Sequence, residues 1–414
     1  MMSYSQSIII VSAGIMQIPA IQTAKSLGLH VIATDKNPDA AGFAYCDEPV
    51  LIDSKDVDGH IHYVREAKTR FNIVGAFAGS DIAVTVAAIA NELGLPGVPN
   101  EVALRSHNKS LMKKRWIEDG IPTPYGEEIT DPSQARPLVE RIGLPVIVKP
   151  VDNAASRGSM KVEQFDALDE AVSKAFAVSR SRTVIIEQYV VGYEQSVETI
   201  IFDGIHHHVG MADREFGFHP YHIETAHVDP SILPVSQQDL IYAVVDAAAR
   251  SLGISFGPAK ADMIWTDKGP MILEMTGRLS GGFHSQYTTP LSTGQDPIRA
   301  VIEMSVGRGF NPEHITPKSH MTALCSGIFP EPGRIVAIEG LEEAQALPGV
   351  KKIIINRQVG DILGDYIDNG ERCCWVITAG VDLDAARHAF DQARSLLKIV
   401  TEPVSQTAKA GLPQ

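Results

Sequence analysis

The chain has 414 residues, of which 44% are hydrophobic and 21% are charged, and its formal charge is −14. This length allows about three domains with cores of their own, and the composition is that of a globular protein rather than a disordered or fibrous one. An acidic chain repels phosphate backbones and anionic lipid surfaces. We therefore expect neither nucleic acid nor membrane among its partners.

Targeting signals and cysteine usage indicate the compartment. No apolar run approaches the ~20 residues of a membrane-spanning helix, and the first residues lack the basic segment and long apolar core of a signal peptide. The four cysteines show no CxxC spacing, and adjacent Cys373 and Cys374 are expected to be two buried thiols. A large chain with few, unpatterned cysteines is typical of a reducing compartment, so we expect a cytoplasmic protein.

The first hundred residues alternate short apolar runs with helical periodicity. Residues 7–12 and 30–35 are nearly continuous apolar runs, and between them an apolar-periodic stretch ends at Gly28. Parallel strands that are buried on both faces have this character. A further strand is expected at 73–78, followed by a helix to Leu93. We predict a doubly wound α/β domain over residues 1–100.

The rhythm changes after residue 100. Strands and helices alternate differently through residues 101–310, which we predict to form a second domain, and a smaller α+β domain is expected over 311–400. Within the second domain, residues 204–235 are poorly periodic and rich in His, Pro and Asp, so they are expected to form a long loop. Residues 401–414 are expected to be a disordered tail.

Several familiar nucleotide and catalytic motifs are missing. The sequence has no GxxxxGK[ST] loop, no HExxH and no GxSxG elbow. The turn at Gly14 has one glycine where a dinucleotide fingerprint needs three, although Asp35 lies about where the ribose-binding acid would be. These features make NAD a weak hypothesis.

A distributed set of residues in the middle of the chain suits a polyphosphate. Lys149 ends the apolar run VIVKP, where an ammonium is costly to bury unless an anion meets it. The loop 152–160 (DNAASRGSM) brings small residues and Arg157 between two expected strands, so that backbone N–H groups and a guanidinium are available to phosphate oxygens. A Gly/Ser loop is more often a simple hairpin, so this loop alone is moderate evidence.

Two further elements fit an adenine nucleotide and its metal. The strand end at 187–190, with Glu194 behind it, offers backbone groups and a carboxylate to an adenine edge and a ribose, although a surface hairpin would look similar. Asp262 and Glu274 lie on two expected neighbouring strands, with Arg278 four residues further on. Paired carboxylates repel each other unless a cation lies between them, and hard oxygen ligands are those that Mg²⁺ prefers. Solvated strand carboxylates are the alternative reading, but the apolar flanks disfavour it.

The ordered set Lys109, VIVKP, SRGSM, IIEQYVVGYEQSVE and D…LEMTGR resembles the ATP-grasp superfamily, and within it the carboxylate–amine ligases, including L-amino-acid ligases. The similarity covers nearly the whole chain. The N-terminal unit resembles a pre-ATP-grasp domain, and residues 323–400 resemble the C-terminal domain of biotin-carboxylase-like members. The resemblance implies a three-domain ATP-grasp architecture that combines α/β and α+β units.

The resemblance also implies roles for individual residues. For the nucleotide, the implied residues are Lys109 and Lys149 on the phosphates, Ser156, Arg157, Gly158 and Ser159 over the β and γ phosphates, Glu187, Gln188 and Val190 at the adenine, and Glu194 at the ribose. For the metal they are Asp262 and Glu274. For the substrates they are Arg278 at the carboxylate, acyl phosphate or tetrahedral intermediate, Ser280, Gly281 and Gly282 in the acceptor loop, and Glu198, Glu224 and His227 in the pocket.

Two positions depart from the family pattern. Thr276 stands where the family's E-x-N-x-R motif has Asn, which weakens one metal ligand and leaves open whether one or two metal ions bind. The first metal acid is Asp262 rather than the commoner Glu, and this shorter side chain requires closer strands.

Six of the fourteen histidines fall between 206 and 227. Three consecutive histidines on an extended segment point to alternating faces, so they do not converge on one ion, and no zinc site is expected. His206–His208 are expected to be exposed. His227 follows Glu224 by three residues and is the histidine expected in the substrate pocket, ahead of His222 and His284.

These observations lead us to expect an ATP-dependent carboxylate–amine ligase. The substrate carboxylate would attack the γ-phosphate to give an acyl phosphate and ADP, and an amine would then displace phosphate. Catalysis would consist of positioning and of charge neutralisation by Mg²⁺ (with Mn²⁺ as a substitute), Lys149, Arg157 and Arg278. The amine proton would go to Glu224, His227 or the phosphate.

Two alternatives are a bicarbonate-using, carboxylase-like enzyme and a degenerate ATP-binding scaffold. The expected partners are small-molecule carboxylates and amines or amino acids, together with a second copy of the chain in a homodimer, the latter by resemblance only.

Overall fold

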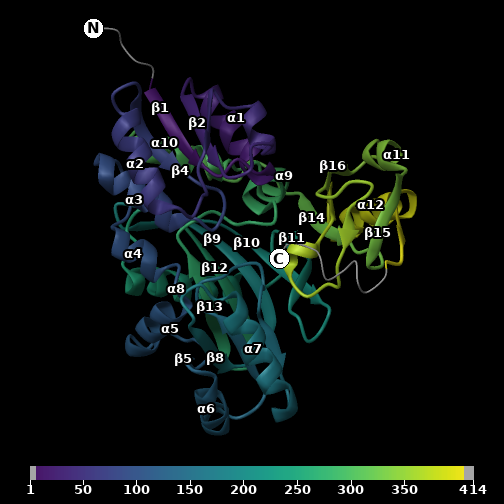
Figure 1. The fold of residues 1–414 in the computed structure, drawn as a ribbon. Helices are drawn as coiled ribbons and strands as arrows, with labels where there is room; N and C mark the ends of the chain where they lie inside the picture. The colour runs from purple at the N-terminus through teal and green to yellow at the C-terminus, as the bar shows by residue number, and fades with distance from the viewer. Residues whose placement is uncertain (1–5, 405–414) are drawn as a thin grey trace.

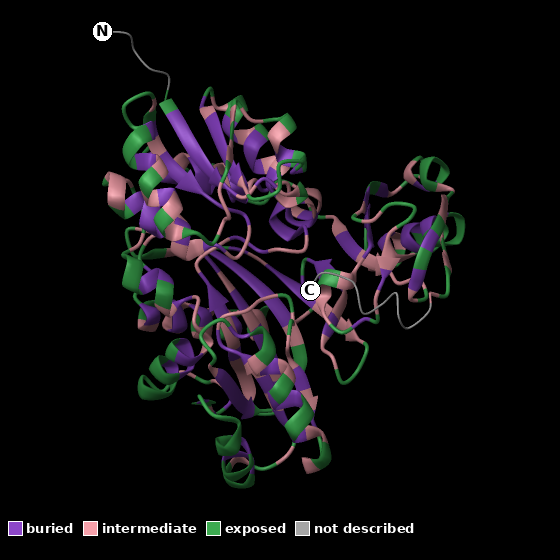
Figure 2. Cartoon of the chain, in the orientation of Figure 1, coloured by how far each residue is buried: buried purple, intermediate pink, exposed green. Residues whose placement is uncertain are grey.

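A computed structural model describes residues 6–404 of the chain. Figure 1 shows an N-terminal unit at the top, a large central unit below it and a smaller C-terminal unit beside them. Most strands are buried, whereas the outer helices expose one face to solvent (Figure 2). All three units combine helices with sheets, and a mixed α/β and α+β architecture is therefore confirmed.

The N-terminal unit is built on a parallel sheet of order β3-β2-β1-β4. Ile8, Ile9 and Ile10 are completely buried because helices cover both faces, as the continuous apolar run indicates. Helix α10 comes from much later in the chain and packs against α1 in the same core. The elements are β1 (Gln6–Val11), α1 (Ile18–Ser26), β2 (His30–Asp35), β3 (Glu48–Leu51), α2 (Val57–Ala67), β4 (Asn72–Phe77), α3 (Ala83–Leu93) and α10 (Pro297–Ser305).

A four-stranded antiparallel sheet of order β5-β8-β6-β7 forms the lower part of the central unit. Asn108 caps the helix that leads into it, because its side-chain oxygen accepts from Ser110 N at 3.0 Å and Leu111 N at 3.1 Å. The elements are α4 (Asn100–Arg105), α5 (Lys109–Glu118), β5 (Gly126–Ile129), α6 (Ala135–Ile142), β6 (Val146–Pro150), β7 (Met160–Val162), α7 (Leu168–Val178) and β8 (Val184–Gln188).

An eight-stranded antiparallel sheet joins the central and C-terminal units, in the order β13-β12-β9-β10-β11-β14-β18-β16. Its ladder passes from β11 to β14 without interruption, so strands on both sides of residue 310 share one sheet. The elements are β9 (Tyr193–Phe202), β10 (Ile205–Gly217), β11 (Ile223–Asp229), α8 (Val235–Leu252), β12 (Gly257–Thr266), β13 (Gly269–Thr276), β14 (Thr322–Ile328), β16 (Val350–Ile355) and β18 (Cys374–Gly380).

The prediction of a long loop over residues 204–235 is wrong. Most of this segment forms β10 and β11, which lie in the middle of the large sheet. Polar side chains on these strands face a cavity rather than an apolar core, and this removes the alternation by which a half-buried strand is recognised. The histidines at 206–208 lie on β10, and the side chain of His206 is only 5% exposed because it packs beside Asp246.

The C-terminal unit adds a three-stranded sheet of order β17-β15-β19. Residues 401 and 402, expected in the disordered tail, instead belong to β19, because Thr401 and Glu402 pair with β15. Residues 403 and 404 follow the strand without regular structure, and residues 405–414 of the predicted tail lie outside the described residues. The elements are β15 (Gly333–Glu339), α11 (Leu341–Gln345), β17 (Ile362–Leu363), α12 (Leu383–Leu396) and β19 (Lys398–Glu402).

Two sequence expectations concern the chain as a whole. All four cysteines are free thiols, and Cys373 and Cys374 are buried, as expected. Among residues 6–404, no helix is both long and apolar enough to span a bilayer. The domain boundaries near 100 and 310 stay predictions.

Candidate active site

A cavity of about 380 Å³ lies where the three units meet. Its walls come from the turn after β4, the start of α5, the end of β6, the loop before β7, strands of the large sheet and the segment before β18. Predicted site residues that line it are Lys109, Lys149, Ser156, Arg157, Ser159, Glu194, Glu224, Asp262, Glu274, Arg278, Gly281 and Gly282. Predicted residues outside its lining are Gly158, Glu187, Gln188, Val190, Glu198, His227 and Ser280.

One end of the cavity carries the lysines predicted to meet phosphates. Lys149, at the end of β6, forms an ion pair with the buried Glu187 of β8, and Lys113 Nζ lies 3.1 Å from the same carboxylate. Burial alone would raise the pKa of Glu187, but the two ammonium groups lower it to about 2. Burial alone would lower the pKa of Lys149, but Glu187 and Glu274 hold it above its ordinary value. Lys149 is therefore a charged group that lines the cavity.

The loop before β7 arches over this end of the cavity. Ala155 and Ser156 have φ values of 61° and 60°, a left-handed conformation that residues other than glycine rarely adopt and that clusters at ligand sites. Asn153 anchors the loop by accepting from Lys109 Nζ at 2.7 Å through its carbonyl and from Arg157 Nε at 3.1 Å through its side chain. The loop's backbone therefore faces the cavity beside two cations.

The predicted adenine segment lies at the end of β8. The Glu187 side chain holds two lysines instead of lining the cavity. Gln188 is exposed, and its N–H donates to Tyr125 O at 2.8 Å. The roles proposed for Gln188 and Val190 stay predictions.

The two predicted metal acids are cross-strand neighbours, since Asp262 of β12 is the register partner of Glu274 of β13. Lys109 Nζ lies 3.1 Å from Glu274, and Asp262 is held by Lys260 and Arg214. Burial raises the pKa of Asp262, but Arg214 and Lys260 outweigh burial and lower the pKa below its ordinary value. Two carboxylates on adjacent strands fit a hard divalent cation.

The third position of the metal motif is incomplete. Thr276 Oγ1 is buried and has no hydrogen-bond partner within residues 6–404. No group of three His, Cys, Asp or Glu side chains in the described part of the chain is arranged to hold a metal ion. The protein therefore supplies two carboxylates, and the remaining ligands of a metal ion must come from elsewhere.

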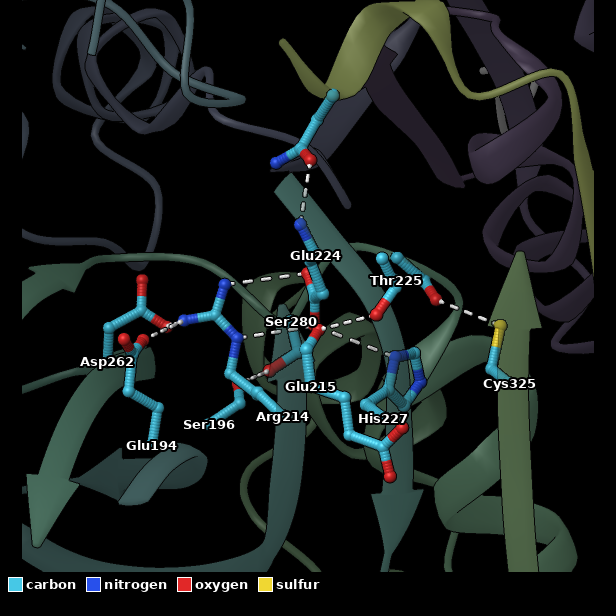
Figure 3. A network of polar contacts seen from close by, with 12 residues as sticks. Glu194, Ser196, Arg214, Glu215, Glu224, Thr225, His227, Asp262, Ser280 and Cys325 are labelled. Atoms are coloured by element: carbon cyan, nitrogen blue, oxygen red, sulfur yellow. Dashed lines mark hydrogen bonds and ion pairs between the residues drawn. The ribbon is translucent and has the colours of Figure 1, made fainter. Parts of the chain in front are cut away.

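Arg214 lies at the centre of the acidic network in Figure 3, and the sequence analysis missed it. Its guanidinium lies 2.7 Å from Asp262, 3.2 Å from Glu224 and 3.6 Å from Glu194. Burial lowers the pKa of Arg214, but the three carboxylates outweigh burial and raise the pKa above its ordinary value. Arg214 has an acidic residue on each side in the sequence, and on a strand this pattern would have indicated a buried ionic site. The sequence predicts a loop here, so the pattern carried no such meaning.

Arg278 lies on the opposite wall of the cavity, next to the N-terminal unit. Arg278 Nε lies 3.7 Å from Asp81 Oδ1, and its Nη1 donates to Leu279 O at 2.9 Å. Burial raises the pKa of Asp81, but His107 and Arg278 outweigh it and hold the pKa well below the ordinary range. The Gly79-Ser80-Asp81 turn follows β4, and the sequence analysis did not connect it with the site.

The C-terminal unit contributes two further residues that the sequence analysis missed. Arg372 lies 3.8 Å from the Glu224 carboxylate, and Asn369 Oδ1 accepts from Glu224 N at 3.2 Å. Asn369 N also donates to Ala155 O at 3.0 Å. One segment of the C-terminal unit thus contacts both the phosphate loop and the predicted substrate residue.

Some predicted substrate residues lie just behind the cavity wall. The buried Glu198 accepts hydrogen bonds from Ser280 N and Ser285 Oγ, so it supports the acceptor loop from behind. Burial raises the pKa of this carboxyl group above its ordinary value. His227 is almost fully buried, and its Nδ1 lies 3.8 Å from Glu224.

Comparison with family models assigns two parts of the chain. Residues 142–286 match the model described as "ATP-grasp domain", and residues 327–402 match the one described as "L-amino acid ligase C-terminal domain 2". The first match contains the Gly/Ser loop and both metal acids. The second contains Asn369 and Arg372.

Similar sequences include the uncharacterized protein y4rH of Sinorhizobium fredii, which is 26% identical over 84% of this chain and 73% of that protein. A D-alanine–D-alanine ligase of Aromatoleum aromaticum is 31% identical over 54% of this chain and 65% of its own length. The match to that ligase thus covers just under two thirds of its length.

Similar solved structures extend over nearly the whole chain. An L-amino acid ligase from Bacillus licheniformis aligns with a TM-score of 0.82 over 96% of this chain and 99% of its own, at 22% identity. Phosphoribosylglycinamide synthetase from Anaerococcus prevotii aligns with a TM-score of 0.75 over 96% and 100%, at 20% identity. At these identities the likeness establishes the fold.

Proposed function

Because the chain belongs to the ATP-grasp ligases, which form C–N bonds, we propose that it joins a carboxylate to an amine through an acyl phosphate, with release of ADP and phosphate. The cavity itself is the observation that carries this proposal. It gathers Lys109, Lys149, Arg157 and Arg278 around two carboxylates that are register partners. Such a set of charges suits a polyphosphate and its divalent cation.

The first half-reaction needs positioning and neutralisation of charge rather than a protein nucleophile. The substrate carboxylate oxygen forms a bond to the γ-phosphorus as the bond from phosphorus to the bridging oxygen of ADP breaks. Lys149 and Arg157 line the end of the cavity that we assign to the transferring phosphoryl group. Fixed positive charges in a buried site stabilise such a transition state without reorganisation.

A magnesium ion, when bound, neutralises phosphate charge, and Asp262 and Glu274 are the residues that would hold it. Both carboxylates lie on adjacent strands and are paired with basic side chains, and their oxygens are ligands that suit a hard cation. Lys109, Lys260 and Arg214 balance these acids in the structure.

We assign Arg278 to the acyl group. It lines the cavity beside Gly281, and its Nε lies 3.7 Å from Asp81 Oδ1 of the N-terminal unit. A guanidinium at this place suits both a carboxylate and the oxyanion that forms when the amine attacks. We propose amino acids as the first substrate class to examine, since a matching C-terminal family model bears the name of L-amino acid ligases.

A crossed screen tests the proposed function. Purified protein, ATP and MgCl2 are incubated with each proteinogenic L-amino acid, singly and in pairs, and released phosphate is measured, with mass spectrometry on positive pairs. We expect phosphate and an amide only when a carboxylate and an amine are both present. ADP release stimulated by bicarbonate alone would instead indicate a carboxylase-like reaction, and no turnover with any pair would contradict the proposal.

Arg278→Ala is expected to abolish amide formation, and normal turnover by this variant would remove its assigned role. Arg299→Ala is the matched control, because Arg299 binds Glu303 in α10 and does not line the cavity.

A further inference from the structure

The five carboxylates that line the cavity are all engaged by cations. Each has a Lys or Arg nitrogen within 3.7 Å and so already has a cation as its partner. The carboxylates are Asp81, Glu194, Glu224, Asp262 and Glu274. Glu224 is held most strongly: burial raises its pKa, but Arg214, His227 and Arg372 outweigh burial and hold the pKa well below the ordinary range.

Two histidines line the same cavity, and they differ in what their ring nitrogens contact. His222 Nε2 lies 2.6 Å from Glu194 and is therefore engaged. His284 Nε2 is buried and has no hydrogen-bond partner within residues 6–404. An unpartnered imidazole nitrogen is costly to bury, and at a cavity wall it indicates a group that a ligand completes.

The other ring nitrogen of His284 is held by a small polar cluster. Nδ1 lies 3.4 Å from Thr289 Oγ1 and 3.6 Å from Asp229 Oδ2, and Thr289 Oγ1 donates to the same Asp229 oxygen at 2.7 Å. Because the Thr289 proton points to Asp229, its oxygen accepts from Nδ1–H. This arrangement favours the tautomer that leaves the Nε2 lone pair unprotonated.

The backbone around His284 is unusual in the same place. His284 begins a π-helix, η5 (His284–Thr288), directly after the Gly281–Gly282 loop, and Phe283 has a φ of 72°. Single π-helical turns and left-handed non-glycine residues both cluster at functional sites. The strained segment places the imidazole next to the loop that we assign to the acceptor.

We propose that His284 is the general base that takes the proton from the attacking amine, with Asp229 as its positioning residue. The inference rests on the proposed function. In the second half-reaction the amine nitrogen forms a bond to the acyl carbon, the bond from that carbon to the phosphate oxygen breaks, and phosphate leaves with the electron pair. Because an amino acid arrives as an ammonium ion, one of its protons moves to His284 Nε2 before attack and returns to solvent after the product leaves. The second proton, released as the amide forms, leaves with the phosphate.

Protonation states agree with this assignment. Burial, reinforced by the neighbouring His227, lowers the pKa of His284 well below its ordinary value, so the imidazole enters the step in its neutral form. Burial raises the pKa of Asp229 to about 7, despite the hydrogen bond from Thr289. Once ionised, Asp229 stabilises the positive charge that develops on the adjacent ring.

His227, the histidine that the sequence analysis placed in the pocket, is less suited to this role. It stacks on His284 with ring centroids 4.7 Å apart, lies outside the cavity lining, and Thr288 Oγ1 lies 3.5 Å from its Nε2. Burial lowers its pKa to about 4, although Glu224 opposes the shift. His227 therefore packs behind the group that faces the substrates.

The test uses two nucleophiles on the full-length protein. Hydroxylamine is unprotonated at neutral pH and attacks acyl phosphates without a base, whereas an amino acid arrives as an ammonium ion. Wild type is first assayed with ATP, Mg²⁺ and each proteinogenic L-amino acid, with hydroxylamine to give a hydroxamate and with a second amino acid to give a dipeptide. A wild type that forms neither product contradicts the proposed function itself, separately from the role of His284.

For His284→Gln, we expect dipeptide formation to fall by about 100-fold, the usual range for loss of a general base, while hydroxamate formation stays within about twofold. Equal retention of both products, or equal loss of both, would overturn the assignment. His314→Gln is the matched control, because His314 binds Glu303 outside the cavity and its loss should change neither product.

Asp229→Asn provides a second, independent measurement should the first variant fail to fold. It keeps the side-chain volume and leaves His284 in place but removes the carboxylate beside Nδ1. We expect the ratio of dipeptide to hydroxamate to fall by about tenfold, since a tautomer-positioning carboxylate acts only through its histidine. An unchanged ratio in a folded Asp229→Asn protein would refute the proposal.

Discussion

Arg214 Nη1 lies 2.7 Å from Asp262 Oδ1, so an arginine holds one of the two carboxylates that we propose bind the metal. The same guanidinium also reaches Glu194 and Glu224 (Figure 3). It lies over the Phe216 ring, 4.7 Å from the ring centroid. Three carboxylates share this one buried cation, so its removal leaves Asp262 with Lys260 alone and Glu224 with Arg372 as its remaining guanidinium.

Arg214→Met should therefore destabilise the fold strongly. Breaking a buried pair by removal of one partner typically costs about 3–5 kcal/mol, and we expect a decrease of that size in the free energy of unfolding, measured by urea denaturation in the presence of EDTA. Added Mg²⁺ should restore part of it by neutralising Asp262. Arg387→Met is the control, since the exposed pair of Arg387 with Glu215 is worth about 1 kcal/mol or less. Equal effects of the two substitutions would contradict the central role of Arg214.

A matched pair of lysines separates nucleotide binding from stability. Lys113 and Lys149 both hold Glu187, but only Lys149 lines the cavity. Either substitution by Met removes one of the two cations that hold the buried Glu187, and we expect comparable losses in the free energy of unfolding. Lys149→Met should also lower kcat/KM for ATP by about 100-fold, as for other charge-stabilising groups, whereas Lys113→Met should lower it far less. Equal kinetic losses would contradict the assignment of Lys149 to the phosphates.

Thr276 allows the proposed metal site to be tested by adding a ligand rather than by removing one. Its Oγ1 is buried without a hydrogen-bond partner in the described part of the chain, and it stands where related motifs have Asn. Thr276→Asn supplies an amide oxygen to the site, so we expect the Mg²⁺ concentration for half-maximal activity to fall. Mn²⁺ binding by isothermal titration calorimetry in the presence of ADP should show the same direction. Asp262→Asn should act in the opposite direction, because it removes a charged ligand.

The sequence predicted the residues with distinctive local patterns and missed those that depend on long-range pairing. Lys149, Asp262 and Glu274 end or interrupt apolar strands, and a charged residue at such a position can be recognised from the sequence alone. Arg214 was missed because β10 faces the cavity with polar side chains and reads as a loop.

Other residues of the cavity come from distant parts of the chain. Asp81 and Asn369 reach the site from the two outer units, and no local signal links them to it. Glu187 was placed by resemblance at the adenine, whereas its side chain is committed to two buried lysines. The position of a strand end was thus predictable, but the direction of its side chain was not.

Asp229 should change how the free energy of unfolding depends on pH. Its pKa is raised from an ordinary 3.8 to about 7, chiefly by burial, so between these values the folded protein holds a proton that the unfolded chain has released. Stability contributed by this group is therefore fully present below about pH 4 and is lost as pH rises toward 7, with a slope of at most ~1.4 kcal/mol per pH unit.

His227 acts in the opposite direction, because its folded pKa of about 4 lies below its ordinary 6.5. Its contribution rises with pH over the same window, so it opposes that of Asp229 in the wild-type profile. The difference between Asp229→Asn and wild type isolates the carboxyl group. Urea denaturation at half-unit steps from pH 4.5 to 7.5 should show the variant gaining stability relative to wild type as pH rises. A flat difference would show that Asp229 ionises near its ordinary pKa in the folded protein.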